Sequence, residues 1–385
     1  MTDGPYRQPR TGLVLTGGGA RAAYQAGVLW AIADLLPRTH SNPFPIIWGA
    51  SAGAINAAAL AASAGNFRRG VRRLVCVWRN LRVSEVYRSD LRGVSSSGAR
   101  WLWALVFGGL AERNPVSLLD NSPLRQLLNR HIDLNSIRQA ILDGHLEALS
   151  VSATGYTSGE SVTFYQGSRA LMPWKRARRV GFRSEIRTEH LMASSAIPFV
   201  FPAVRINREF FGDGSMRLLA PISPALHLGA ERLIIVGSGR VSREARVRVK
   251  TEGYPSVAQV AGHALSSIFL DTLEVDLEGL ERINRTISLM PQEIRGSSGL
   301  TLRHVEYLLF TPSRELESIA LDHAHDLPRT VRFFLGGVGA MRRGGGALLS
   351  YVLFEKGFCR ALLDLGYNDT MRRRDEVLSF FAPHD

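Results

Sequence analysis

One serine stands in the surroundings that nucleophilic chemistry requires. Ser51 is the centre of Gly49-Ala50-Ser51-Ala52-Gly53, which follows the apolar run 46–48 and precedes an alanine-rich run over 54–64. This order predicts a buried strand, a tight turn and a helix, the context of a nucleophile elbow. Small neighbours, with glycine at 49 and 53, let a serine occupy a strained turn at a helix N-terminus. The pattern favours an acyl nucleophile at Ser51; a plain glycine- and alanine-rich connection is the alternative.

A glycine-rich turn about thirty residues earlier could bind an anion. The apolar run 11–16 enters Gly17-Gly18-Gly19-Ala20-Arg21, and apolar periodicity predicts a helix over 24–36. Consecutive glycines leave backbone N–H groups unshielded, so the turn fits either a dinucleotide or an oxyanion hole. Ala22 occupies the last glycine position of the dinucleotide fingerprint, and the acidic residue expected after a second strand is missing. An oxyanion hole is therefore favoured, and no cofactor is expected.

The acid best placed for base catalysis is Asp213. It lies in Phe210-Phe211-Gly212-Asp213-Gly214-Ser215, directly after an aromatic run that predicts a strand end. A parallel sheet places its active groups at such ends, although Asp-Gly is also a common turn dipeptide. A serine esterase with a triad would need a histidine later in the chain. The candidates are His227, His263, His304 and His323.

The remaining pattern alternates strands and helices. We predict strands over 149–154, 161–165 and 231–239, and helices ending near 80 and over 122–128 and 257–290. The arginine-rich stretch 174–187 is interpreted as a solvated loop with a secondary, phosphate-facing alternative. The short apolar run 101–111 fits a core helix, an interfacial segment or a lid. We expect two parts, a catalytic domain over 11–245 and a mainly helical extension over 246–385 that packs on the core or forms a homodimer interface.

The amino-acid composition limits the classes of partner that the protein is expected to bind. The 385 residues carry Lys+Arg 47 against Asp+Glu 34, a net charge of +13 that is nearly all arginine. Guanidinium groups bind phosphate, so phospholipid and nucleic acid are both compatible with the charge, as is a merely solvated surface. Cys76 and Cys359 form no disulfide framework or metal spacing, and His323 and His325 are interpreted as exposed loop residues, so no metal is expected. The polar start over 1–10 and the lack of a long apolar run predict neither a signal peptide nor a membrane span.

Several motifs in this order give the chain a family resemblance. The turn at 17–21, the elbow at 49–53, Ala193-Ser194-Ser195-Ala196-Ile197-Pro198, Phe201-Pro202 and Asp213-Gly214 closely resemble bacterial patatin-like phospholipases over about 11–239. The resemblance implies a three-layer α/β/α fold with a central, mostly parallel sheet, plus the helical C-terminal extension. It implies a Ser–Asp dyad, with Ser51 as nucleophile and Asp213 as base. It also implies an oxyanion hole from the amides of Gly17, Gly18 and Gly19, with Arg21 ordering the turn.

The expected function is hydrolysis of phospholipid or lysophospholipid esters at an anionic membrane surface. We expect a cytoplasmic, peripherally membrane-associated enzyme that binds no nucleic acid. The alternatives are an anionic-lipid or phosphoinositide-binding protein with little turnover, and a Ser–Asp–His carboxylesterase. Two positions depart from the family pattern: Ala22 replaces a glycine, and Ser215 replaces the usual glycine or alanine, where its hydroxyl could tune Asp213.

Overall fold

The fold is organised by one ten-stranded sheet. A computed structural model describes residues 9–37, 42–88, 117, 119–240, 254–290 and 303–382. The main order is β10-β9-β1-β2-β3-β4-β6-β5, and the β7–β8 hairpin joins through pairing of β8 with β3. The first five strands of this order are mutually parallel. The strands are β1 Thr11–Leu15, β2 Ile46–Ala50, β3 Ala148–Gly155, β4 Ser161–Gly167, β5 Trp174–Arg176, β6 Arg179–Arg183, β7 Val204–Ile206, β8 Glu209–Gly212, β9 Arg232–Val236 and β10 Glu306–Phe310.

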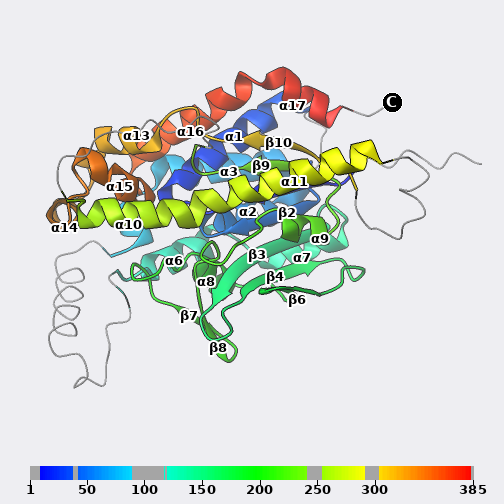
Figure 1. The fold of residues 1–385 in the computed structure, drawn as a ribbon, viewed down its shortest axis with the longest axis horizontal. Coiled ribbons are helices and arrows are strands. Elements are labelled where there is room, and N and C mark those ends of the chain that lie inside the picture. Colours follow the sequence, from blue (N-terminus) through cyan, green and yellow to red (C-terminus); the bar gives the residue numbers. More distant parts are fainter. Residues whose placement is uncertain are drawn as a thin grey trace, which may run out of the picture.

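Helices cover both faces of this sheet, giving three layers (Figure 1). Alternate residues of the buried strands face opposite ways: Leu13 and Ile47 pack in the core below α1, α2, α3 and α16, and Val14 and Trp48 pack below α9 and α11. The helices are α1 Ala23–Leu35, α2 Ala52–Ala61, α3 Phe67–Asn80, α4 Val83–Val86, α6 Ser122–His131, α7 Asn135–Leu142, α8 Thr188–Ser194, α9 Ser223–His227, α10 Val257–Ser266, α11 Thr272–Leu289, α13 Leu316–Asp322, α14 Arg329–Gly337, α15 Gly346–Val352, α16 Lys356–Met371 and α17 Arg374–Phe381. The predicted α/β fold with a central, mostly parallel sheet is confirmed.

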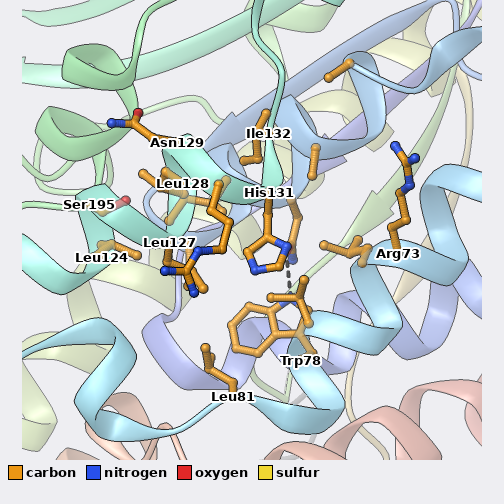
Figure 2. Close-up of a pocket in the computed structure, with 18 of the residues that line it drawn as sticks. Arg73, Trp78, Leu81, Leu124, Leu127, Leu128, Asn129, His131, Ile132 and Ser195 are labelled. Carbon is orange, nitrogen blue, oxygen red and sulfur yellow. Dashed lines mark hydrogen bonds between the residues drawn. The ribbon is translucent and has the colours of Figure 1, made fainter.

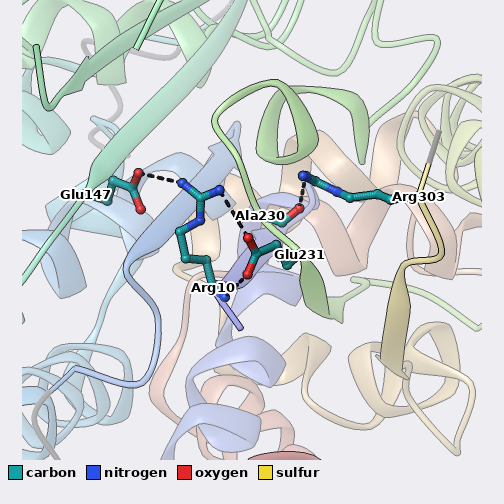
Figure 3. A network of polar contacts seen from close by, with 5 residues as sticks. All are labelled: Arg10, Glu147, Ala230, Glu231 and Arg303. Atoms are coloured by element: carbon teal, nitrogen blue, oxygen red, sulfur yellow. Dashed lines mark hydrogen bonds and ion pairs between the residues drawn. The ribbon is translucent and has the colours of Figure 1, made fainter. Parts of the chain in front are cut away.

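An arginine network closes the amino-terminal edge of the parallel strands (Figure 3). Arg10, directly before β1, forms ion pairs with Glu147 before β3 (3.0 Å) and Glu231 before β9 (3.2 Å). Arg303, before β10, donates to the carbonyl of Ala230. These contacts align the strand starts, so the opposite, carboxyl-terminal edge is left for the catalytic loops.

The C-terminal region is helical, as predicted, and is built into the core. Its strand β10 extends the sheet beside β9, and α16 lies along α1. The helix predicted over 257–290 is present as α10 and α11, joined by a π-helical turn over Ser267–Asp271. In Figure 1 the two helices form one long rod across the molecule.

The structure corrects two local predictions from the sequence. The stretch 174–187 is not only a loop: β5 and β6 form a ribbon in it because Val180 is buried and stacked rings of Tyr165 and Trp174 cover the edge of the sheet. Asp213 follows β8, which pairs antiparallel with β3, so it does not end a parallel strand. The run 101–111 lies outside the described residues. Among the helices that the structure describes, none is long and apolar enough to cross a bilayer.

Close packing of α1 on α16 generates a stability prediction. A Cβ atom at Gly366 would lie 2.2 Å from the carbonyl oxygen of Tyr24. Alanine favours a helix by about 1 kcal/mol over glycine, but overpacking at a backbone contact costs about 1–3 kcal/mol. We therefore expect Gly366→Ala to lower the free energy of unfolding measured in urea. The matched control is Gly279→Ala in α11, where a Cβ atom meets nothing within 4 Å and stability should rise slightly. Equal stabilisation by both variants would contradict the packing argument.

Candidate active site

The turn between β2 and α2 has the strained geometry of a nucleophile elbow. Ser51 has φ 53° and ψ −131°, a conformation that non-glycine residues rarely adopt. The flanking glycines are required by space, since a Cβ atom at Gly49 would lie 2.4 Å from the carbonyl oxygen of Gly53. Ser51 lies between the carboxyl-terminal end of β2 and the start of α2, in the order of strand, turn and helix that the sequence predicted.

Asp213 lies close to Ser51 in a fully buried position. Its carboxylate accepts a hydrogen bond from the backbone N–H of Ser215 (2.8 Å) through Oδ1. Its other oxygen, Oδ2, and the hydroxyls of Ser51 and Ser215 are buried without a hydrogen-bond partner. Buried polar groups are normally paired, so three unpaired oxygen atoms at one place indicate a site prepared for a reacting group.

Burial sets the electrostatics of Asp213. Loss of solvation raises its pKa from 3.8 to about 6, and the nearby Ser51 and Ser215 groups offset only part of that rise. The Ser51 hydroxyl is thus near enough to influence the carboxylate, although the hydrogen bond between them is not formed in this geometry. A carboxylate with a pKa near neutrality is a better proton acceptor than an ordinary one.

The carboxyl-terminal end of α8 and the residues that follow it hold both residues in place. The Oγ atom of Ser194 accepts from the backbone N–H of Ser51 (2.9 Å) and donates to the carbonyl of Ser152 (2.6 Å). The carbonyls of Ser194 and Ala196 accept from the N–H groups of Gly214 and Asp213. One short segment therefore fixes the elbow and the acid relative to each other. The sequence contained this motif, but its role could not be assigned from residue types.

The glycine turn lies against the same site. Gly19 (φ 56°) and Ser51 line one cavity. A Cβ atom at Gly17 would lie 2.3 Å from the hydroxyl of Ser215, and the ring of Phe269 from the π-helical turn is also in contact there. The turn is therefore packed directly beside the Ser51 and Asp213 groups, where its amides could hold an oxyanion.

Arg21 does not point to the carboxylate of Asp213. It is buried and donates to Ser350 (2.8 Å) and Glu317 (2.8 Å), and its guanidinium stacks 3.9 Å from the ring centroid of Tyr351. The expected role of Arg21 in ordering the turn is compatible with this geometry. The partners from α13 and α15 were not predicted, because nothing local in the sequence links positions some 300 residues apart.

Ser51 lines a mainly apolar cavity of about 1050 Å³. Figure 2 shows part of the lining of this cavity. The cavity lies between α2, α3 and α6, and its walls include Ile55, Leu74, Leu124, Leu128 and Ile132. The volume is at the upper end of what ligand pockets usually enclose. Polar side chains, among them Arg73, Asn129 and His131, line it as well; Figure 2 shows Arg73 and Asn129 on opposite sides. The sequence had not predicted that α3 and α6 would form these walls.

The candidate triad histidines lie elsewhere. His227 stacks on Trp174 and hydrogen-bonds Ser223, and His323 pairs with Asp326 (3.1 Å). His263 on α10 and His304 before β10 are exposed, whereas Ser51 and Asp213 are buried. In the described part of the chain, no histidine is hydrogen-bonded to Ser51 or Asp213. The described residues also contain no cluster of three side chains suited to a metal ion.

The fold defines an α/β protein with a central, mostly parallel sheet, and its class follows from comparison with known families. The family model for patatin-like phospholipases matches residues 13–226, more than half of the chain. The chain therefore belongs to the patatin-like phospholipase family, a family of lipid ester hydrolases. A search of the curated proteins found no significant match.

Solved structures provide further likenesses. Human GIVD cytosolic phospholipase A2 is 12% identical with a TM-score of 0.47, over 97% of this chain and 60% of that one. VipD from Legionella pneumophila is 14% identical with a TM-score of 0.38, over 96% and 67%. ExoU of Pseudomonas aeruginosa, solved with SpcU, is 18% identical with a TM-score of 0.21, over 41% and 35%. The chain thus spans about three fifths of the human enzyme, and the family assignment rests on the domain match.

The double anchor at Ser194 predicts a positioning effect. Ser194→Ala removes the acceptor of the Ser51 N–H, so the elbow should shift while the cavity stays intact. We expect kcat for a soluble ester to fall roughly 10- to 100-fold with KM little changed, and Ser194→Thr to restore part of it. Thr370→Val, which removes another buried hydroxyl far from the site, should leave both constants unchanged. A rise in KM alone would contradict the positioning role.

Proposed function

We propose that this protein is a serine lipid acyl hydrolase of the phospholipase A or lysophospholipase type that works through Ser51 and Asp213. The observation that supports it most directly is that the unpaired Ser51 hydroxyl lines an apolar cavity and lies near enough to the unpaired Asp213 carboxylate to lower its pKa. The reaction class follows from the family, and the substrate follows from the cavity.

The chemistry can be written with these groups alone. Asp213 accepts the hydroxyl proton as Ser51 Oγ attacks the ester carbonyl, and the glycine turn, with Gly19 at the cavity wall, faces the resulting oxyanion. The protonated carboxyl then gives its proton to the leaving alcohol. Water, deprotonated by the same carboxylate, attacks the acyl-enzyme, and the protonated carboxyl returns that proton to Ser51 Oγ as it leaves and the fatty acid is released. A base with a pKa near 6 can take part in both halves because neither protonation state is strongly disfavoured.

The cavity fits the acyl part of a lipid. Its walls close to Ser51 come from Ala52, Ile55 and Ala59 of α2, and deeper from Leu74 of α3 and Leu128 of α6. Apolar side chains gain about 25 cal/mol per Å² when an alkyl chain replaces water, so long chains should bind more tightly than short ones. An anionic membrane surface as the source of substrate is part of this proposal.

The dyad predicts a large loss of turnover. Ser51→Ala removes the nucleophile and Asp213→Asn removes the base, so each should lower kcat for lysophospholipid hydrolysis by about 10⁴-fold or more. Folding is checked by circular dichroism and thermal unfolding. A fluorophosphonate should label the wild type at Ser51 and leave Ser51→Ala unlabelled. Full turnover in either variant would refute the assignment, and labelling at another serine would move the nucleophile elsewhere.

Asp213 predicts the acid limb of the pH profile. Since the base acts only when ionised and its pKa is raised to about 6, kcat/KM should fall as the pH drops through 6 and stay level above it. Because the Ser215 hydroxyl lowers this pKa, Ser215→Ala should move the limb to higher pH. The measurement is kcat/KM for a soluble, non-ionising ester between pH 4.5 and 9. A wild-type profile flat down to pH 4.5 would contradict Asp213 as base.

A further inference from the structure

Large apolar side chains gather on one exposed surface of the described part of the chain. They lie on or directly beside α14 and the amino-terminal end of α10, and they are unusually exposed for their type. We call this surface the α10–α14 face. The exposed fractions are Tyr254 98%, Val257 70%, Val260 55%, Phe333 79%, Phe334 40% and Val338 38%. Single exposed apolar residues are normal, but a group of this kind marks an interaction site.

The two elements are neighbours in space. The backbone N–H of Ala258, in the first turn of α10, donates to the carbonyl of Val338 at the end of α14 (3.0 Å). Figure 1 shows α14 and the start of α10 together at one end of the molecule, with α15 beside them. The exposed side chains therefore belong to one face and are not scattered.

The charge of this face is of one sign. Residues 327–354 contain four arginines and no Asp or Glu, and residues 254–270 contain no acid either. Arg329, Arg332 and Arg342 are exposed. The acid that precedes α14, Asp326, is engaged by His323 and His325 at 3.1 and 3.2 Å. Arginine and aromatic side chains on an amphipathic helix are the combination that binds the interface of an anionic bilayer.

One short helix connects this face to the active site. α15 packs on α10, where a Cβ atom at Gly262 would lie 2.8 Å from the Cβ of Ala347. Its other end reaches the glycine turn, because the carbonyl oxygen of Tyr351 lies against Gly19, and Phe354 lines the cavity. A helix of seven residues is only about 10 Å long, so the face and the cavity belong to the same end of the fold.

We propose that the α10–α14 face is the surface by which this protein docks on anionic phospholipid membranes. Phe333, Phe334 and Val257 enter the boundary between headgroups and acyl chains, and Arg329 and Arg342 bind lipid phosphates. The inference deepens the proposed function, because docking here would bring the cavity to a lipid surface. The binding itself does not require turnover.

A second basic surface of the protein is an alternative docking site and can be compared with the α10–α14 face. The β5–β6 ribbon carries Lys175, Arg176 and Arg178 beside Met172 and Phe182, which are 74% and 49% exposed. It offers fewer apolar side chains, and its Arg183 is occupied by the carbonyls of residues 167–171. The α10–α14 face is favoured because it combines more apolar area with a structural link to the active site.

The test measures binding apart from catalysis. The full chain with Ser51→Ala is sedimented with vesicles of phosphatidylcholine containing 0 or 30% phosphatidylglycerol, about the range in which anionic charge recruits arginine-rich surfaces. We expect binding to require phosphatidylglycerol and to weaken with salt. Phe333→Ser/Val257→Ser and, separately, Arg329→Gln/Arg342→Gln should each lower the bound fraction at least about fivefold, since each removes one of the two contributions. The matched control, Met172→Ser/Phe182→Ser on the ribbon, should bind like the parent.

Each outcome decides the inference. Loss of binding in the ribbon control, with full binding in both variants of the α10–α14 face, would place docking on the ribbon and overturn the inference. Light scattering tests the other occupant, a second copy: a dimer that Phe333→Ser/Val257→Ser dissociates without affecting vesicle binding would also overturn it. In the Ser51-containing background, the α14 variants should hydrolyse a soluble ester normally. If the wild-type chain cleaves no soluble ester, the proposed function fails while the docking result stands.

Discussion

The feature on which the rest depends is a carboxylate, that of Asp213, which is buried with no cation beside it among the described residues. Moving the pKa of Asp213 from 3.8 to about 6 corresponds to roughly 3 kcal/mol against the ionised form in the folded state. An arginine placed against it would remove that cost and also its basicity. The glycine turn does contain an arginine, Arg21, but its guanidinium is held by Glu317, Ser350 and the ring of Tyr351. The C-terminal helices thus keep the nearest charge of the turn away from the base.

The same arrangement explains why the C-terminal region is inseparable from the site. Gly19 lies against the backbone of Tyr351, and Phe269 lies against Gly17. The π-helical turn that carries Phe269 interrupts an otherwise regular helix, and such turns are frequent at functional sites. The glycine turn is therefore braced from two sides by residues beyond 246. The predicted boundary between residues 245 and 246 marks a change in sequence pattern. Residues on its two sides nevertheless pack against each other, as Tyr351 does against Gly19.

The sequence pattern was sufficient to predict the structure where that structure depends on neighbouring residues alone. The elbow around Ser51 and the glycine turn each depend on small residues within five or six positions, so their structures follow from steric demands. It was insufficient where strands pair over long distances. Asp213 was placed at the end of a parallel strand, but β8 turned out to be antiparallel, because pairing depends on the whole sheet and not on the strand's own residues. The ribbon over 174–183 was hidden for the same reason: Val180 and Trp174 are isolated among arginines and show no alternation of useful length.

The strain at Ser51 requires a partner that the motif does not contain. A non-glycine residue at φ 53° costs about 1–3 kcal/mol and persists only when its surroundings hold it. Ser194 supplies that hold through the Ser51 N–H, and it uses its own carbonyl to fix Gly214 beside the acid. The elbow and the acid are far apart in the chain, so neither motif can set the distance between Ser51 Oγ and Asp213 Oδ2. That distance is set by the segment 194–196, which bonds to both motifs. This third motif contributes no reacting atom, but the geometry depends on it as much as on the other two.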